Sequence, residues 1–136
     1  MNIVETDYWC LLLPPEWSAE QEEDTVCITD QDGIGELALT ALIREQDDAN
    51  VASPAQIARH ESPEVPDWVA AAFGEFSGVT GSFQEEGSVV QEWYLGHGPA
   101  LLYCTYVCAS EDEGMDVAAV EEILGTLVPG DALLDS

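Results

Sequence analysis

Carboxylates are the most frequent side chains in this sequence that could do chemistry, since 28 of its 136 residues are Asp or Glu. Two carboxylates on opposite sides of a bound sugar can hydrolyse a glycosidic bond when one of them has a raised pKa. With so many acids, almost any fold brings some pair to that spacing. A pair of acids therefore does not indicate a hydrolase by itself, and no residue is predicted to be catalytic.

The segment Asp30-Gln31-Asp32-Gly33 is similar to part of a calcium-binding loop. In an EF-hand loop, glycine occupies position 6 and a bidentate glutamate occupies position 12. Placing Gly33 at position 6 puts Ile28 at the first ligand position and Leu39 at the last, and neither side chain can ligate calcium. We therefore interpret the segment as a tight hairpin turn, which Asp-Gly favours.

The four cysteines, Cys10, Cys27, Cys104 and Cys108, lie in apolar segments, where a free thiol behaves as a small hydrophobic group. In a strand, Cys104 and Cys108 would be separated by roughly 13 Å, too far to share one zinc ion. The sequence therefore predicts no metal site and no cofactor. Because Glu5 stands where a secretory signal would be basic, we expect a cytoplasmic protein with reduced thiols.

Two histidines could act as a general base, but neither has a partner that points to catalysis. His60 follows Arg59 near the end of an expected helix, where the helix dipole favours a cation. His97 lies in a Gly-His-Gly-Pro turn whose glycines should expose it, so it is a candidate for contact with a partner. Neither a nucleophile elbow nor a phosphate-binding loop is present, and we expect a protein that is not an enzyme.

Further candidates for partner contact lie in one strand and one acidic loop. Trp93 and Tyr94 are adjacent in an expected strand and face opposite sides of the sheet, so one of them could add to an exposed apolar patch. Glu111, Asp112 and Glu113 form an acidic loop in front of a helix, where their charge favours the positive end of the helix dipole. We assign partner contact to these five residues together with His97.

The first strands that position these residues are expected at residues 7–13, 25–30 and 36–45. Pro14 and Pro15 end the first of them and mark it as an edge strand followed by a turn, after which Trp17 should fold back onto the core. The acidic segment 20–24 is expected to be a solvated loop.

A helix should begin at Ser53-Pro54, with serine as the N-cap and proline at the first helical position. Pro63 and Pro66 break it, and the spacing of Val69, Ala72 and Phe73 predicts a second helical piece. Three strands then form an antiparallel meander over residues 79–85, 88–95 and 99–108, followed by a helix over 117–127.

Hairpin-connected strands separated by helices indicate an α+β fold, in which the helices pack on an antiparallel sheet. The predicted order is three strands, a broken helix, three strands and a helix. No repeat or linker divides the sequence, so residues 1–136 are expected to form a single domain, with a loose tail at 130–136.

The chain opens with a strand that ends in a Pro-Pro-Glu-Trp turn, Tyr8 to Trp17, and it closes with a strand and a helix, Leu101 to Leu127. Together with the broken middle helix, this order resembles the PsbP-like α/β/α sandwich over nearly the whole chain. Members of that family include the extrinsic photosystem II protein, a nuclear import cofactor and chaperones for type VI secretion effectors. They share no catalytic machinery and act by contacting other proteins, so the resemblance implies a binding function. None of the family's functional residues maps onto this chain.

The charge of the chain excludes two classes of partner. Arg44 and Arg59 are its only basic residues apart from the histidines, and the formal net charge is −26. Two arginines cannot neutralise a run of phosphates, and an anionic membrane would repel a protein of this charge. We therefore expect neither nucleic acid nor a membrane as a partner. The acidity itself has two interpretations: a solvated rim or adaptation to a salty cell, and electrostatic steering toward a basic partner.

Three classes of function follow from these observations. The first is a non-enzymatic module, of the adaptor, chaperone or immunity type, that engages a basic protein. The second is a DNA mimic, whose spaced acids imitate phosphates and inhibit a DNA-binding protein. The third, a carboxylate-based hydrolase, has only the abundance of acids in its favour.

Overall fold

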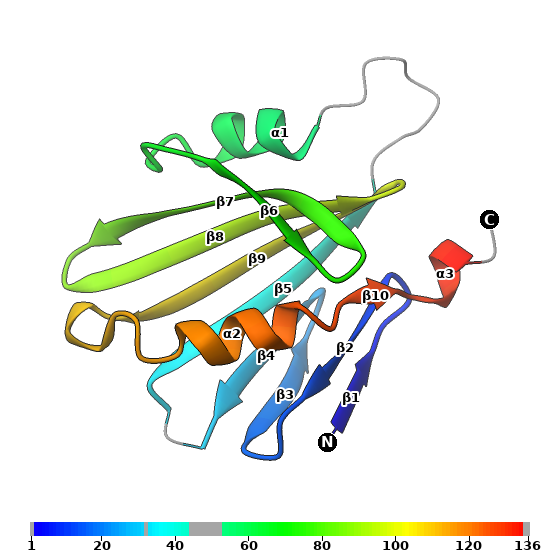
Figure 1. Ribbon diagram of the computed structural model, residues 1–136, viewed down its shortest axis with the longest axis horizontal. Coiled ribbons are helices and arrows are strands. Elements are labelled where there is room, and N and C mark those ends of the chain that lie inside the picture. Colours follow the sequence, from blue (N-terminus) through cyan, green and yellow to red (C-terminus); the bar gives the residue numbers. More distant parts are fainter. Residues whose placement is uncertain (1, 32, 44–52, 135–136) are drawn as a thin grey trace.

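The computed structural model describes residues 2–31, 33–43 and 53–134 (Figure 1). Asp32 of the predicted turn, Arg44 and the acidic residues at 45–48 lie outside the described residues. The rest of the turn behaves as expected, since Gly33 has a positive φ of 65° and its N–H donates to the backbone oxygen of Asp30 at 3.2 Å.

The larger of two sheets is antiparallel and has seven strands in the order β3-β4-β5-β9-β8-β7-β6. Its strands are β3 (Trp17–Glu22), β4 (Thr25–Asp30), β5 (Gly35–Ile43), β6 (Val69–Phe73), β7 (Phe76–Glu85), β8 (Ser88–His97) and β9 (Ala100–Ala109). A second, three-stranded sheet has the order β1-β2-β10. It consists of β1 (Asn2–Glu5), β2 (Trp9–Leu13) and β10 (Val128–Pro129).

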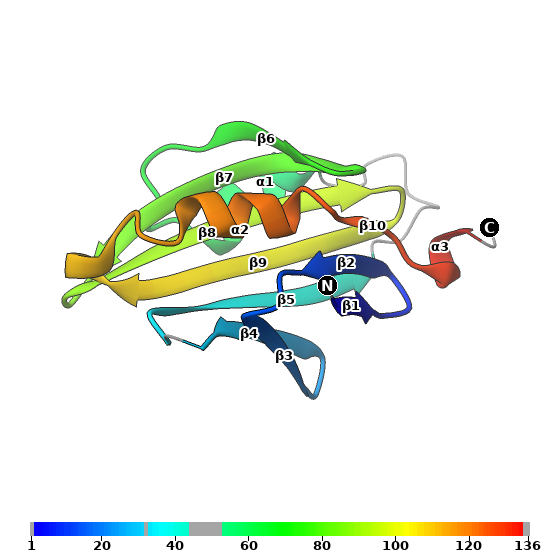
Figure 2. The same cartoon turned by 60° about the horizontal axis from the view of Figure 1, so that its bottom comes forward.

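The helices lie on both faces of the large sheet, which confirms the predicted α+β class. The helices are α1 (Pro54–Glu61), α2 (Val117–Leu124) and α3 (Asp131–Leu134), and a 3-10 helix spans Ser110–Asp112. Figure 2 shows α2 and the small sheet on the near side of the large sheet, with α1 behind it. In the segment expected to be loose, the N–H of Ala132 in α3 donates to the backbone oxygen of Asp7 at 2.9 Å.

The alternation of residues along β9 defines the two faces of the large sheet. Even-numbered residues such as Leu102 and Cys104 belong to the main core, which α2 and β2 complete; we call this side the core face. Odd-numbered residues such as Leu101 and Tyr103 point to the opposite side, where a separate small cluster forms beneath α1. We call this second side the α1 face.

The second half of the predicted broken helix is a strand, which corrects that expectation. Residues Val69–Phe73 form β6 and pair with β7 through a hairpin that turns at Gly74, whose φ is +60°. Ala71 and Phe73 pack against the main core, so burial follows a period of two rather than the helical period. The backbone pairing with β7 outweighs the helix propensity of the alanines.

Two further expectations for the first third of the chain are corrected. The acidic segment predicted as a loop is largely strand, since β3 extends to Glu22, and as the edge strand it can keep its acids in solvent. The strand before the proline pair is not an edge strand, because β2 lies between β1 and β10. The turn after it is confirmed by the N–H of Trp17, which donates to the oxygen of Pro14, and Trp17 itself is buried as expected.

Candidate ligand-binding site

One carboxylate on the α1 face is buried without a full set of hydrogen-bond partners. Glu92 of β8 is 3% exposed, and its Oε2 accepts a hydrogen bond from the hydroxyl of Tyr103 on the neighbouring strand β9. Its Oε1 accepts no hydrogen bond from any of the described residues. Buried polar atoms in proteins are normally paired, so this oxygen needs an explanation.

Glu92 lines a pocket of about 440 Å³, which we call the Glu92 pocket. The floor consists of strand residues, Glu92 and Tyr94 from β8 and Tyr103 from β9. The walls come from β5, α1 and the turn after α1; they are Thr40, Leu42, Ile57, Glu61, Ser62 and Glu64. The lining therefore combines three carboxylates with apolar and aromatic surface, and it includes no basic side chain among the described residues.

The two tyrosines of the pocket are hydrogen-bond donors near neutral pH. The Tyr94 hydroxyl lies 2.8 Å from the Ser62 hydroxyl, with which it shares a buried hydrogen bond. Burial raises the pKa of Tyr94 and of Tyr103 above the ordinary phenol value, and for Tyr103 the hydrogen bond to Glu92 and the negative charge of Glu92 act in the same direction. The two ring centroids lie 4.9 Å apart with 44° between the ring planes, so the floor of the pocket is partly aromatic.

Two features of the α1 sequence position the helix beside the Glu92 pocket: an N-cap that starts the helix and a buried alanine that anchors it to the sheet. The Ser53 hydroxyl accepts from the backbone N–H of Gln56, and the Gln56 side chain accepts from the N–H of Ser53, which confirms the predicted N-cap. Ala58 is fully buried against Tyr94 and Leu101 of the sheet. The docked helix thereby places two of its residues, Ile57 and Glu61, in the lining of the Glu92 pocket.

The two basic side chains of α1, Arg59 and His60, do not line the Glu92 pocket. Arg59 is exposed and lines a different cavity, together with Pro63, Val65 and Trp68. His60 is exposed and lies 3.5 Å from Glu61. Across residues 2–31, 33–43 and 53–134, no group of three or more His, Cys, Asp or Glu side chains has the geometry to hold a metal ion.

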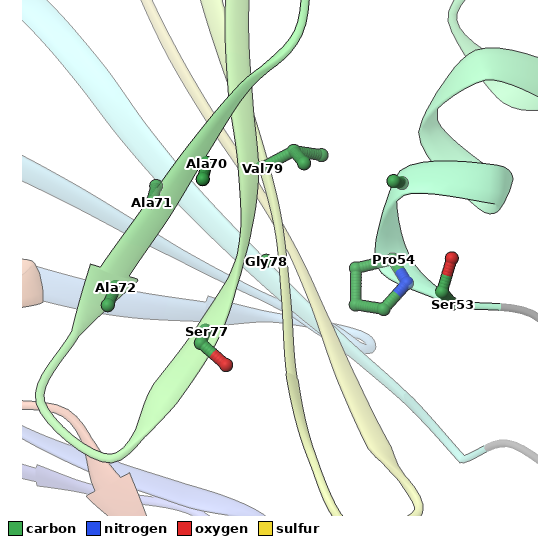
Figure 3. A pocket seen from close by; sticks show the side chains of 9 residues that line it. Ser53, Pro54, Ala70, Ala71, Ala72, Ser77, Gly78 and Val79 are labelled. Carbon is green, nitrogen blue, oxygen red and sulfur yellow. The ribbon is translucent and has the colours of Figure 1, made fainter.

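A larger cavity, of about 520 Å³, lies between the start of α1 and the β6–β7 hairpin (Figure 3). Ala70 and Ala72 of β6 face Pro54 across it, and Ser77 and Val79 belong to its lining. The lining residues carry no carboxylate, imidazole or thiol. The cavity therefore offers small apolar side chains and hydroxyls but no group that could hold a charge.

The structure buries both aromatic residues that the sequence offered for an exposed patch. Trp93 is 1% exposed on the core face, and Tyr94 is 4% exposed on the α1 face. Both sides of β8 are covered at this point, so the expectation that one of the two rings is exposed is wrong. Tyr94 belongs to the lining of the Glu92 pocket.

The other predicted partner residues lie outside the Glu92 pocket. His97 is half-buried rather than exposed, because its ring packs against Phe76 and its Nδ1 lies 2.8 Å from the backbone oxygen of Glu75. Glu111 and Glu113 are exposed and Asp112 is half-buried in and after the 3-10 helix. Their role in partner contact stays a prediction.

Sequence reasoning missed Glu92 and Tyr103, although one signal pointed to the first of them. Glu92 is the single charged residue between Ser88 and Leu95, a strand that is otherwise apolar or neutral. A charge inside a buried strand is rare unless it is paired, so its position alone marked it for attention. Tyr103 gave no such signal, because a tyrosine in a central strand is ordinary core material.

The thiols of Cys27 and Cys104 both have raised pKa values. All four cysteines are free, and burial raises the pKa of Cys104 above its ordinary value. Burial, together with hydrogen bonds to the carboxylates of Glu22 and Glu36, raises the pKa of Cys27 to about 12. A nucleophilic cysteine needs a lowered pKa, so neither thiol is suited to that role near neutral pH.

The architecture, a long antiparallel sheet with a helix on each face, is that of the PsbP-like fold. It is similar to the solution structure of cyanobacterial PsbP from Synechocystis, with a TM-score of 0.62 and 10% identity over 94% of this chain and 91% of that one. It is also similar to LpqN of Mycobacterium tuberculosis, a protein involved in cell envelope biogenesis, with a TM-score of 0.58 and 16% identity over 90% of this chain and 83% of LpqN.

A crystal structure of a Bacteroides thetaiotaomicron protein matches with a TM-score of 0.61 and 17% identity over 89% of this chain. This chain spans only 44% of that protein's length. No protein-family model and no curated protein sequence matches the chain. These likenesses establish the fold, which confirms the resemblance inferred from the sequence. None of the helices in the described ranges has the length and hydropathy needed to cross a membrane.

Proposed function

We propose that this protein is a non-enzymatic binding module that engages a basic protein. The proposal rests on one part of the α1 face. The helix α1 packs mainly on β7 and β8, and the α1 face continues beyond these strands onto β5, β4 and β3. We call the part on β3, β4 and β5 the acidic face. Its side chains include Glu20, Glu22, Thr25, Cys27, Glu36 and Leu42.

The acidic face combines apolar and anionic groups in a way that suits a protein partner. Leu42 is 52% exposed, and Val107 of the adjoining strand β9 is 40% exposed. The carboxylates of Glu20, Glu22 and Glu36 are exposed on the same side of the sheet. Protein interfaces combine an apolar centre with a polar rim, and a rim of one sign selects partners of the opposite sign.

The comparisons support a binding role without naming a partner. The fold is shared with PsbP and LpqN, and neither is described by a reaction that it catalyses. A module that binds through charge also explains why a chain with two basic residues carries 28 acids, since the summed field accelerates association with a cationic partner.

Two matched charge variants test the proposal. Their affinity is measured for a lysine-rich peptide and, once it is isolated, for the natural partner. The triple variant Glu20→Gln/Glu22→Gln/Glu36→Gln removes three charges from the acidic face. The control Glu86→Gln/Glu121→Gln/Glu122→Gln removes three exposed charges away from the acidic face and from the acidic loop assigned from the sequence. We expect the first variant to weaken binding about tenfold more than the control.

Salt provides the second measurement, because binding through exposed charges weakens as the screening length falls from about 10 Å at 0.1 M to about 3 Å at 1 M. Equal losses in the two triple variants, or binding that salt leaves unchanged, would contradict a specific acidic face. Displacement of the partner by duplex DNA would instead favour the DNA mimic. Turnover of a glycoside that single acid substitutions abolish would favour the hydrolase.

A further inference from the structure

We propose that the Glu92 pocket receives the ammonium group of a lysine side chain presented by the basic partner. This inference rests on the proposed function and assigns it a specific anchor point. It starts from the oxygen Oε1 of Glu92, which is buried and accepts no hydrogen bond from the described residues. A cationic donor that reaches this oxygen would satisfy a group whose burial is otherwise costly.

The state of the two carboxylate oxygens favours an ammonium over a guanidinium group. Arginine binds carboxylates best as a fork, with two parallel hydrogen bonds to the two oxygens. Here Oε2 already accepts from the Tyr103 hydroxyl, so Oε1 is the one oxygen of this pocket-lining carboxylate that has no partner among the described residues. A lysine ammonium is a compact charge with three donors that needs only a single carboxylate oxygen, and its other donors can reach water or the carboxylates of Glu61 and Glu64 in the lining.

The rest of the lining suits the aliphatic stem of a lysine. Leu42 and Ile57 supply apolar surface on either side of the pocket, and the paired rings of Tyr94 and Tyr103 supply an aromatic surface. Lysine stems pack along such surfaces while the charged end makes polar contacts, and an ammonium near an aromatic face gains a further attraction. The volume of about 440 Å³ falls within the range of small-ligand sites.

The required group must come from another molecule. The sequence contains no lysine, so neither this chain nor a second copy of it can supply a lysine side chain. Arg59, the arginine that the structure describes, is exposed at a different cavity. The pocket thus has an anionic end and an apolar wall complementary to a residue that the protein itself lacks.

The test uses a small probe, so that its outcome does not depend on the acidic face. N-acetyl-lysine methylamide is titrated into the full-length protein while chemical shifts of the Thr40, Tyr94 and Tyr103 amides are followed. We expect saturable binding to the wild type, a loss of about tenfold or more in Glu92→Gln, and no change in the matched exposed variant Glu85→Gln. The same probe acetylated at its side-chain nitrogen has no charge and should not bind.

A second variant tests the geometry of the carboxylate. In Tyr103→Phe both oxygens of Glu92 lack the tyrosine donor, so the preference for the lysine probe over the corresponding arginine probe should fall. Thermal unfolding checks that each variant is folded. If Glu92→Gln does not fold, the binding of the charged and the acetylated lysine probes to the wild type is compared instead, and that comparison decides whether the pocket binds an ammonium group. Three results would each overturn the inference. They are equal wild-type binding of the charged and the acetylated lysine probes, unchanged binding of the lysine probe in folded Glu92→Gln, and tighter wild-type binding of the arginine probe than of the lysine probe.

These outcomes are separable from those for the proposed function. If the lysine probe fails while the basic partner still binds in a salt-dependent manner through the acidic face, the pocket assignment is wrong and the proposed function stands. If the probe binds at Glu92 but no basic protein binds, the pocket takes small amines and the proposed function is wrong.

Discussion

Two buried carboxylates accept hydrogen bonds from tyrosines of the same strand, yet they differ in how completely they are paired. Tyr106 on the core face donates to Asp116 at the start of α2, and Tyr103 on the α1 face donates to Glu92. Only the Glu92 carboxylate retains a buried oxygen without a partner among the described residues. We infer that the first pair serves to hold α2 on the sheet, whereas the second has capacity left for a ligand.

The structural pair gives a prediction for stability. Tyr106→Phe removes the hydrogen bond and leaves the buried carboxylate of Asp116 without its donor, so the free energy of unfolding should fall by about 1–3 kcal/mol. Urea unfolding at neutral pH measures it. Asp116→Asn keeps an oxygen that can accept from Tyr106 and should cost less; a Tyr106→Phe protein as stable as the wild type would contradict the structural role.

At the residue level, the sequence located charged and aromatic groups but not their partners. It placed Glu92, Tyr94 and Tyr103 in strands, but which of them meet depends on the register of β8 against β9, which aligns Tyr94 with Tyr103. Register is a property of paired strands and cannot be read from either strand alone. The burial of Trp93 in the main core and the packing of His97 against the β6–β7 turn likewise depend on segments distant in sequence.

Among the elements, α1 is held on the sheet by a small set of buried contacts. It has eight residues, and helices this short are not stable alone in water. Its buried contacts belong to the small cluster of Ala58, Tyr94 and Leu101, which is separate from the main core. Because α1 supplies a wall of the Glu92 pocket, the integrity of the pocket depends on this helix remaining docked.

Removing the N-cap should therefore loosen α1 selectively. We expect Ser53→Ala to destabilise the helix by about 1 kcal/mol. Amide hydrogen exchange should become faster within Pro54–Glu61 and stay unchanged in β9, and affinity for the lysine probe should fall with it. Ser18→Ala, an exposed serine of β3, is the control. Faster exchange throughout the sheet would show instead that α1 is part of the global folding unit.

The order of elements was predictable where periodicity and turn residues agreed. The meander of β7, β8 and β9 and the N-cap at Ser53 emerged from local signals alone. The strand β6 did not, because Val69, Ala72 and Phe73 fit a helical spacing as well as a short strand, and only pairing with β7 decides between them. The short strands β1 and β10 were also missed, since neither has enough residues to show a pattern.

For the whole molecule, net charge opposes folding while it promotes binding, so salt should act on the two in opposite directions. Screening reduces the repulsion among 28 acids, and we expect the unfolding temperature to rise by about 3–5 °C, the equivalent of about 1 kcal/mol at this size, between 0.1 and 1 M NaCl. Thermal unfolding followed by circular dichroism measures this. Over the same range the affinity for a basic partner should decrease; parallel changes would contradict the proposed role of the charge.

Alkaline pH should destabilise the protein through its buried thiols and phenols. Burial raises the pKa of Cys104 above 9.0 and the pKa values of Tyr94 and Tyr106 above 10.0. These groups keep protons in the folded state that the unfolded chain releases, so stability is complete below about pH 9 and is lost as the pH rises from there toward the folded-state values. Urea midpoints at about pH 8 and pH 10.5 should differ, and Tyr106→Phe should reduce that difference; equal midpoints in the wild type would contradict it.

The large sheet ends in two strands of unlike character, and this bears on how the protein behaves in concentrated solution. The outer strand β3 carries Glu20 and Glu22, whereas the opposite outer strand, β6, has the uncharged sequence Val-Ala-Ala-Ala-Phe. Like charges at one margin deter two copies from joining their sheets there, but β6 has no such safeguard of its own. What keeps molecules apart at β6 is the repulsion of the body as a whole, so crowding combined with high ionic strength is the condition under which the protein should begin to self-associate, and that margin is where it should start.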